Sequence, residues 1–322
     1  MDGEVRIERD GPIASLVFDH EERRNAITVD MWDAIPEAMR TLQDDDSVRV
    51  VIMRGAGSEA FVSGADISEF EQTRTGNAGR EYDAMTARAF AALYGLEKPL
   101  IASIHGFCIG GGAAIALTAD LRYAADDARF AVPPARLGLG YHTAGIRTLI
   151  RTVGFSETAD LLFTARRVTA DEARHIGLVN EVFPKDALDE NVDRLAHSIA
   201  DNAPLTIRST KISLQELAKL EAERDMGRVN DSIEHCYQSK DFEEGVRAFM
   251  EKRKPRFLCQ SRGPRRPPGI RLVLAARGLG IRGVLAADRN RSQDQANQDR
   301  DRHHQCVQPF ASTDRDAGGD AR

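Results

Sequence analysis

Short apolar runs alternate with amphipathic stretches along the first part of the chain. The segments VRVVIMRG (residues 48–55) and PLIASIHG (residues 99–106) are nearly continuous in apolar residues, which is typical of strands buried on both faces. The segment REYDAMTARAFAALYGL (residues 80–96) lies between them and is predicted to be a helix. This order of strand, helix and strand predicts an α/β fold.

The flanking segments extend this pattern. VRIERDGPIASLVFD (residues 5–19) is predicted to form two strands joined by an Asp-Gly turn. Thr28 is predicted to be the N-cap of a helix through MWDAIPEAMRTLQ (residues 31–43), which Pro36 should kink unless it lies near the first turn. The later part of the body is predicted to be helical almost throughout, and it ends in FEEGVRAFMEKRK (residues 242–254).

Composition and charge narrow the class of protein. The chain has 322 residues, 42% hydrophobic and 29% charged, which is ordinary for a globular protein with a sizeable core. Its net charge of −6 argues against general nucleic-acid binding. We see no secretory leader and no apolar stretch of about 20 residues, so we expect no membrane insertion. The four cysteines are far apart and match no metal spacing, which favours free thiols and a cytoplasmic location.

The composition changes abruptly at Cys259. From that residue onward the chain has twelve Arg and seven Asp but no Lys, Glu, Met, Trp or Tyr. We predict a disordered Arg-rich tail over residues 259–322, because such a sequence cannot supply a packed core. A basic arm for an acidic partner is the alternative. The body is then divided into a β/α core over residues 1–200 and a helical region over residues 201–258.

Two glycine-containing turns are the candidate sites of chemistry. FVSGADISEF (residues 61–70) and IGGGAAIAL (residues 109–117) each place small residues where a loop enters a helix, and the first N–H groups of a helix have no partner within it. Two such donors that converge on one point would bind a developing oxyanion. Neither turn has the sequence of a phosphate loop or of a dinucleotide-binding turn. A purely structural tight turn is the alternative for each.

Taken together, these turns and three other segments resemble the crotonase (enoyl-CoA hydratase/isomerase) superfamily. The resemblance covers residues 4–258, and its blocks are RRNAIT (23–28), FVSGADISEF (61–70), KPLIASIHGFCIGGGAAIALTADLRYA (98–124), FTARRVTADEARHIGLVNEV (163–182) and FEEGVRAFMEKRKP (242–255). It implies a spiral of ββα units over residues 1–200 and a helical trimerisation region over residues 201–258, in a homotrimer or a dimer of trimers. It also implies an enzyme acting on an acyl-CoA thioester, without a metal and without a cofactor other than the coenzyme A of the substrate.

The resemblance assigns roles to individual residues. The main-chain N–H groups of Ala65 and Gly111 are implied to hold the thioester oxygen, which would explain why Gly111 carries no side chain. Arg24 and Ala26 are implied to line the path of coenzyme A, and Ser63, Asp66 and Ile67 to bound its adenine and pantetheine. The further positions implied to contact the substrate are Cys108, Gly110, Pro134, Leu137, Phe249 and Lys252. Phe249 and Lys252 are implied to reach the coenzyme A of a neighbouring subunit, and a solvent-exposed helix face is the alternative for Lys252.

The sequence departs from the family at two positions that matter to the chemistry. Hydratases of the family use two glutamates to position and activate water. Ala114 and Pro134 stand at these two positions, so hydration by the two-glutamate route is not expected. The simple isomerase, which needs only the second glutamate, would also lose its base.

The block that follows Phe130 offers other candidates for proton handling. Tyr141 stands where the methylmalonyl-CoA decarboxylase branch has a tyrosine, and His142 stands where other members have a catalytic aspartate. The block resembles that branch. The decarboxylase also has a histidine at its first oxyanion donor, however, and Ala65 stands at that position in this chain. We therefore predict an enzyme that stabilises a thioester enolate, with Tyr141 and His142 handling protons. The alternatives are a methylmalonyl-CoA-type decarboxylase and a non-catalytic acyl-CoA-binding scaffold, in which Tyr141 would pack in the interior and His142 would lie on the surface.

Overall fold

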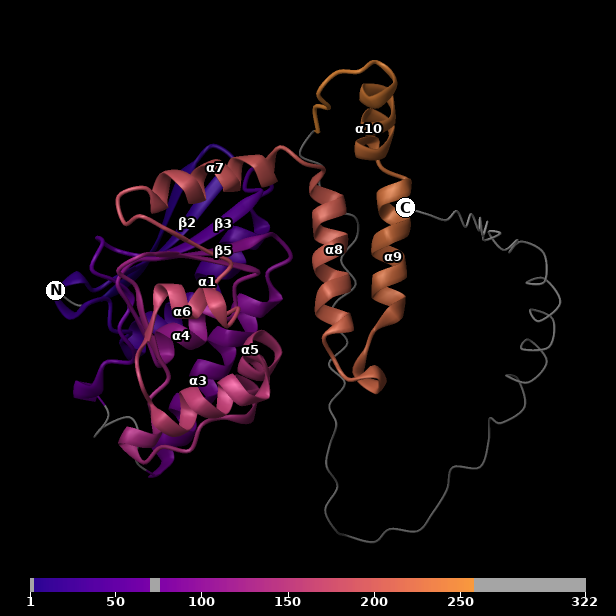
Figure 1. The fold of residues 1–322 in the computed structure, drawn as a ribbon. Helices are drawn as coiled ribbons and strands as arrows, with labels where there is room; N and C mark the ends of the chain where they lie inside the picture. Colours follow the sequence, from indigo (N-terminus) through magenta and orange to yellow (C-terminus); the bar gives the residue numbers. More distant parts are fainter. Residues whose placement is uncertain (1–2, 70–75, 258–322) are drawn as a thin grey trace, which may run out of the picture. The chain divides into compact units, whose positions relative to one another are not determined.

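The computed structural model describes residues 3–69 and 76–257, so the predicted tail lies outside the described residues (Figure 1). Within this part of the chain the strands form two sheets, with the orders β1-β2-β3-β5-β7-β10 and β4-β6-β8-β9. The larger sheet contains β1 (Glu4–Asp10), β2 (Ile13–Asp19), β3 (Val50–Gly55), β5 (Leu100–Ile104), β7 (Leu121–Ala125) and β10 (Glu181–Phe183). The smaller sheet contains β4 (Ala60–Val62), β6 (Phe107–Ile109), β8 (Arg129–Ala131) and β9 (Val168–Thr169).

The chain passes repeatedly from the larger sheet to the smaller one and then into a helix. The three successive passes are β3, β4 and α3 (Gly76–Gly95), then β5, β6 and α4 (Gly111–Ala116), then β7, β8 and α5 (Thr143–Thr164). Strands of successive passes pair in parallel in both sheets. The prediction of an α/β fold built from ββα units is therefore confirmed.

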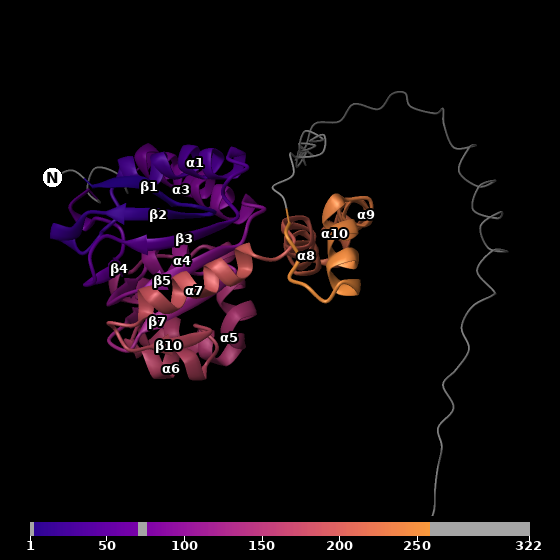
Figure 2. The same ribbon diagram turned by 90° about the horizontal axis from the view of Figure 1, so that it is seen from above.

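The N-terminal elements follow the sequence pattern closely. Strands β1 and β2 pair antiparallel through the turn after Asp10, as predicted. Helix α1 (Val29–Asp44) begins at the predicted N-cap, because the Thr28 hydroxyl accepts a hydrogen bond from the Met31 N–H at 3.2 Å. Pro36 lies within α1 and neither ends the helix nor lies near its first turn. Helix α1 packs beside α3 (Figure 2).

The continuous apolar run of β3 is explained by burial on both faces. Val51 and Met53 belong to the cluster that also contains the buried face of α1. Val50 and Ile52 point the other way and pack with the buried side of α7 (Leu188–Ala200). Because successive side chains of a strand alternate between faces, a strand between two apolar layers must be apolar at every position.

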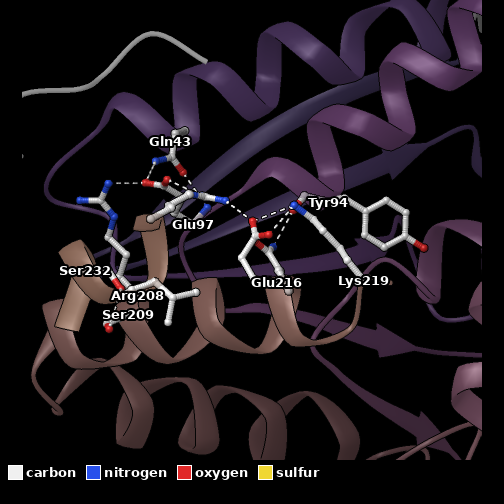
Figure 3. Close-up of polar contacts among 11 residues, drawn as sticks. Gln43, Tyr94, Glu97, Arg208, Ser209, Glu216, Lys219 and Ser232 are labelled. Atoms are coloured by element: carbon white, nitrogen blue, oxygen red, sulfur yellow. Dashed lines mark hydrogen bonds and ion pairs between the residues drawn. The ribbon is translucent and has the colours of Figure 1, made fainter. Parts of the chain in front are cut away.

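Polar side chains attach the C-terminal helices to this core. These helices are α8 (Pro204–Leu217), α9 (Met226–Tyr237) and α10 (Lys240–Met250), which follow the short α6 (Ala170–His175) and α7. Glu97 accepts from Arg208 of α8 at 2.6 Å and from Arg228 of α9 at 3.1 Å (Figure 3). Arg228 also pairs at 3.2 Å with Glu216, whose side chain is almost fully buried. The predicted boundary at residue 200 coincides with the end of α7.

Candidate active site

The first predicted donor, the Ala65 N–H, lies in a segment that pairs with Ile27. The Ile27 N–H donates to the Gly64 carbonyl and the Asp66 N–H donates to the Ile27 carbonyl, both at 2.8 Å. In such a parallel bridge the two neighbours of Ala65 make both hydrogen bonds, so the N–H of Ala65 itself points to the opposite side. Within residues 3–69 and 76–257, this N–H has no hydrogen-bond acceptor.

The second predicted donor, the Gly111 N–H, belongs to the first residue of α4. The Gly110 N–H donates to the Ala131 carbonyl at 2.8 Å, and the Ala114 N–H donates to the Gly110 carbonyl at 3.0 Å. The N–H of a first helical residue has no partner within its helix, and none is found for Gly111 elsewhere in the described chain. A Cβ atom on Gly111 would lie 3.6 Å from the Ala65 nitrogen. The two unpaired main-chain donors are therefore neighbours.

The three consecutive glycines serve different purposes. Gly110 has φ +55°, a conformation that side chains rarely adopt. A Cβ atom on Gly112 would lie 2.1 Å from the Val62 carbonyl oxygen, so glycine is required there for close packing of α4 on β4. Gly111 has no positive φ, and its Cβ atom would meet ordinary contacts only. Neither conformation nor packing therefore requires glycine at position 111.

Asn25 fixes the loop that carries two predicted coenzyme A contacts, Arg24 and Ala26. The buried Asn25 side chain donates to the carbonyls of Ala56 and Ala60 at 2.9 and 2.8 Å and accepts from the His20 N–H at 3.0 Å. These bonds fix the residues on either side of Asn25, of which Arg24 is exposed and Ala26 is buried. Sequence analysis did not single out Asn25, although it lies in the middle of RRNAIT.

The Arg24 guanidinium lies over the Phe107 ring at 4.9 Å from the ring centroid, and that of Arg167 lies at 5.8 Å from the same centroid. In the part of the chain that the structure describes, neither arginine pairs with a carboxylate; the ion pairs with Asp66 and Glu172 are made by the preceding residues, Arg23 and Arg166. Two unpaired cations at one aromatic ring form a local positive charge. Arg167 was not predicted as a site residue.

The predicted adenine and pantetheine contacts lie beside this loop. The Ser63 N–H donates to the Arg24 carbonyl at 3.1 Å. Asp66 is buried and pairs with Arg23 at 3.3 Å. Burial raises the pKa of Asp66, but hydrogen bonds from Ser68 and the charge of Arg23 outweigh it and hold this pKa below its usual value. Asp66 is therefore a carboxylate that orders its own loop.

The remaining predicted contacts are distributed over several elements. Ile67 begins the 3-10 helix η2 (Ile67–Glu69), and Pro134 and Leu137 bound the 3-10 helix η3 (Pro134–Leu137). Cys108 lies in β6 with its side chain fully buried, and burial raises the pKa of its thiol. Phe249 of α10 is 82% exposed, and Lys252 follows this helix on the surface.

The two predicted proton-handling residues occupy contrasting environments. The Tyr141 ring packs against the apolar core, where burial, assisted by the nearby Tyr94, raises its pKa to about 12. The His142 side chain is 71% exposed, with its Nε2 atom 3.4 Å from the Asp83 carboxylate. The three atoms nearest to the Cβ position of Gly111 belong to other residues. A ring packed on the core and an exposed imidazole are the environments that the scaffold alternative predicts for Tyr141 and His142.

Two features are absent from the described residues. No group of three or more His, Cys, Asp or Glu side chains is arranged to hold a metal ion. Among the helices described here, none is both long and apolar enough to cross a membrane.

Comparison with known proteins identifies the family. The model of the enoyl-CoA hydratase/isomerase family matches residues 8–260. A short-chain-enoyl-CoA hydratase of Clostridium acetobutylicum is 33% identical over 250 residues, which cover 78% of this chain and 95% of the relative. Methylmalonyl-CoA decarboxylase of Escherichia coli is 31% identical over 252 residues, which cover 76% and 94%. A crystal structure of an enoyl-CoA hydratase/carnithine racemase from Magnetospirillum magneticum matches with a TM-score of 0.74 and 34% identity, covering 81% of this chain and 97% of that one.

The chain therefore belongs to the enoyl-CoA hydratase/isomerase family, and it is an enzyme of the crotonase superfamily.

Proposed function

We propose that this enzyme acts on an acyl-CoA thioester and stabilises its enolate between the N–H groups of Ala65 and Gly111. The observation that carries the proposal is the position of Gly111, whose Cβ atom would lie 3.6 Å from the Ala65 nitrogen. Both N–H groups lack an acceptor in the described chain. A ligand oxygen between them would pair two donors that are otherwise unsatisfied.

The chemistry follows from charge. When the carbon beside the thioester carbonyl loses a proton or a carboxylate, the electron pair left behind moves into the carbonyl and makes its oxygen negative. Fixed donors aimed at this oxygen lower the barrier, and one donor contributes about 3 kcal/mol. The step needs no metal or cofactor, since the thioester itself accepts the electrons.

The absence of two carboxylates favours a substrate that carries its own. Ala114 lies on α4 one turn after Gly111, and Pro134 begins η3; neither side chain exchanges a proton. Two glutamates at these positions would repel a malonyl-type carboxylate, because like charges in a low-dielectric site interact strongly.

Decarboxylation is accordingly the specific reaction that we favour. The C–C bond to the carboxylate breaks, carbon dioxide leaves, and the electron pair forms the enolate without any base. A proton then adds to the carbon. Tyr141, with a pKa of about 12, keeps its proton at neutral pH and is the proposed donor, which would require the acyl group to reach the phenol.

The proposed partners are coenzyme A and further copies of this chain. Arg24 and Arg167 have no carboxylate partner among the described residues, and they supply positive charge near the predicted path of coenzyme A, as anionic phosphates require. The C-terminal helices expose large apolar side chains, which indicates an interface. They are Leu214, Leu217, Ile233, Tyr237, Phe242, Val246, Phe249 and Met250. We propose that this surface forms the trimer.

The test is incubation with crotonyl-CoA, 3-hydroxybutyryl-CoA and methylmalonyl-CoA, with products identified by mass spectrometry. We expect methylmalonyl-CoA to give propionyl-CoA, and the Gly111→Val variant to lose this activity. Binding of all three esters without turnover would instead indicate the acyl-CoA-binding scaffold. Efficient conversion of crotonyl-CoA would contradict the proposed role of Ala114 and Pro134.

A further inference from the structure

Trp32, the only tryptophan of the chain, has a buried indole N–H without a partner. It lies in the first turn of α1, and its side chain is 2% exposed. Its Nε1 atom has no hydrogen-bond acceptor in residues 3–69 and 76–257. Buried donors are nearly always paired, so an unpaired one in a native structure requires an explanation.

The indole lies beside the two main-chain donors. Its Cζ2 atom would be 3.5 Å from a Cβ atom on Gly111, which in turn would be 3.6 Å from the Ala65 nitrogen. In tryptophan only Cε2 separates Cζ2 from Nε1, so both atoms belong to the same edge of the ring. The unpaired indole N–H therefore lies at the same site as the two unpaired main-chain N–H groups.

Packing holds the indole in this position. The rings of Trp32 and Phe90 lie 5.3 Å apart at 56°, and Phe90 belongs to α3. Neighbouring residues of α1, Met31 and Ile35, are fully buried. The Nε1 atom itself is closed to solvent, whereas the neighbouring Gly111 and Ala65 are partly exposed.

We propose that the Trp32 indole N–H donates a hydrogen bond to an oxygen atom of the acyl group, at the second or third carbon. This inference rests on the proposed function, since it takes the gap between Ala65 and Gly111 as the place of the thioester oxygen. The N–H groups of Ala65 and Gly111 bind the thioester oxygen. A third donor beside them therefore lies near the carbon atoms that follow the thioester carbonyl in the acyl group, and near any oxygen atoms that these carbons carry.

Such a donor selects the substrate class. A plain acyl chain leaves the indole N–H unpaired in the complex, whereas a carboxylate at the second carbon or a hydroxyl at the third accepts from it. Sites with a dedicated donor discriminate against analogues that lack the acceptor, because the donor then stays buried and unpaired. Trp32 is accordingly a positioning and specificity residue.

A single indole resonance makes a direct test possible. The full chain, labelled with ¹⁵N-tryptophan, gives one indole N–H signal in a TROSY spectrum. We expect 3-hydroxybutyryl-CoA, or the analogue of methylmalonyl-CoA whose carboxylate is replaced by a sulfonate and which therefore cannot decarboxylate, to move its proton resonance downfield, as hydrogen bonding does. The two esters distinguish an anionic acceptor at the second carbon from a hydroxyl at the third. Butyryl-CoA is the control, because it fills the same space without the acceptor.

The variant Trp32→Phe provides an independent measurement. Phenylalanine keeps the aromatic packing on Phe90 and removes the donor. By isothermal titration calorimetry, Trp32→Phe should bind the better oxygen-bearing ester about tenfold more weakly, since a hydrogen bond to a charged acceptor contributes that much. Its affinity for butyryl-CoA should stay within about twofold of the wild type, or rise, because no donor is left unpaired.

The outcomes separate this inference from the function on which it rests. If all esters bind and Trp32→Phe weakens butyryl-CoA as much as the others, with no selective shift of the indole signal, Trp32 is a packing residue and the inference is wrong. If no ester binds the wild-type chain, the proposed function fails and this inference fails with it. If the variant does not fold, the spectrum of the wild-type chain decides.

Discussion

A methyl group placed at Gly111 distinguishes a ligand site from a structural turn. The Cβ atom of Gly111→Ala would meet Trp32 at 3.5 Å and the Ala65 nitrogen at 3.6 Å. These are ordinary van der Waals distances, and Gly111 has no positive φ. The variant should therefore fold, and its thermal midpoint should change by no more than a few degrees. Alanine within a helix is more stable than glycine by about 0.5–1 kcal/mol, so the helix propensity of the variant does not lower its stability.

The same methyl group should impair catalysis strongly. An oxygen bonded to both nitrogens must lie about 3 Å from each, in the space that the methyl group enters beside Ala65. Loss of one oxyanion donor costs about 2.7–4 kcal/mol, or about 10² to 10³ in kcat. We expect Gly111→Ala to lose at least this much in kcat/KM on the best substrate, and Gly111→Val, with two more methyl groups, to lose all measurable activity.

The neighbouring glycines are matched controls. At Gly112 the new Cβ atom would lie 2.1 Å from the Val62 carbonyl oxygen, so Gly112→Ala should lower stability by about 1–3 kcal/mol or more. At Gly110 the new atom has nothing within 4 Å, but φ is +55°, so Gly110→Ala should cost about 1–3 kcal/mol through backbone strain.

The assay combines thermal unfolding with steady-state kinetics on all three variants. The expected pattern is a stable, inactive Gly111→Ala beside destabilised Gly110→Ala and Gly112→Ala. Retention of wild-type kcat/KM by Gly111→Ala, with unchanged stability, would refute the assignment of the Gly111 N–H to the thioester oxygen.

Five further predictions concern other parts of the molecule. Crotonyl-CoA hydration should be several orders of magnitude slower than in a two-glutamate hydratase, because Ala114 and Pro134 supply no acid or base; a normal rate in a spectrophotometric assay would contradict this. Tyr141→Phe should lower kcat and leave KM nearly unchanged. Since the pKa of Tyr141 is raised to about 12, its neutral form persists at alkaline pH. The wild-type pH–rate profile should therefore show no loss of activity due to this phenol between about pH 6 and 10. A loss of activity near pH 8 that disappears in Tyr141→Phe would refute this prediction. Truncation after Phe257, whose carbonyl accepts from Arg49 at 2.6 Å, should leave the calorimetric midpoint unchanged; a large decrease would mean that the tail stabilises the core. Light scattering should give a trimer or hexamer, and a stable monomer at micromolar concentration would contradict the proposed interface.

The parts of the fold that the sequence predicts are those set by local pattern. Positions 50–53 of β3 are all apolar because Val51 and Met53 face one cluster and Val50 and Ile52 face the other. The strands of the smaller sheet were not predicted, since β4, β6 and β8 have three residues each. A strand of three residues is too short to show a period.

Pro36 lies inside a helix that continues beyond it. Its ring removes one hydrogen bond of the helix, which predicts a kink or a position in the first turn. Helix α1 nevertheless runs from Val29 to Asp44 with Pro36 inside it. The buried side chains of Met31, Ile35 and Met39 anchor α1 on both sides of the proline, and burial of each contributes about 1.5–3 kcal/mol.

The candidate site was predictable only where its residues belong to recognisable turns. The glycine turn before α4 and the turn that contains Ala65 can both be read from a few consecutive residues. Arg167 joins Arg24 at the ring of Phe107, but more than 140 residues separate the two arginines in the sequence. The sequence position of one arginine does not predict that the other lies near it, because the chain between them folds through several ββα units before it returns to the same ring.

Trp32 marks a different limit of sequence reasoning. A tryptophan on the buried side of an amphipathic helix has the same pattern as any packing residue, and nothing in MWDAIPEAM sets it apart. Its distinguishing property is a missing acceptor, which becomes visible only when every donor near Gly111 is matched with its partner. Two main-chain donors and one indole donor are then unpaired at one site. Since an unpaired buried donor such as the indole N–H is costly to a fold on its own, its place beside two unpaired main-chain donors is better explained by a ligand with several oxygen atoms than by packing.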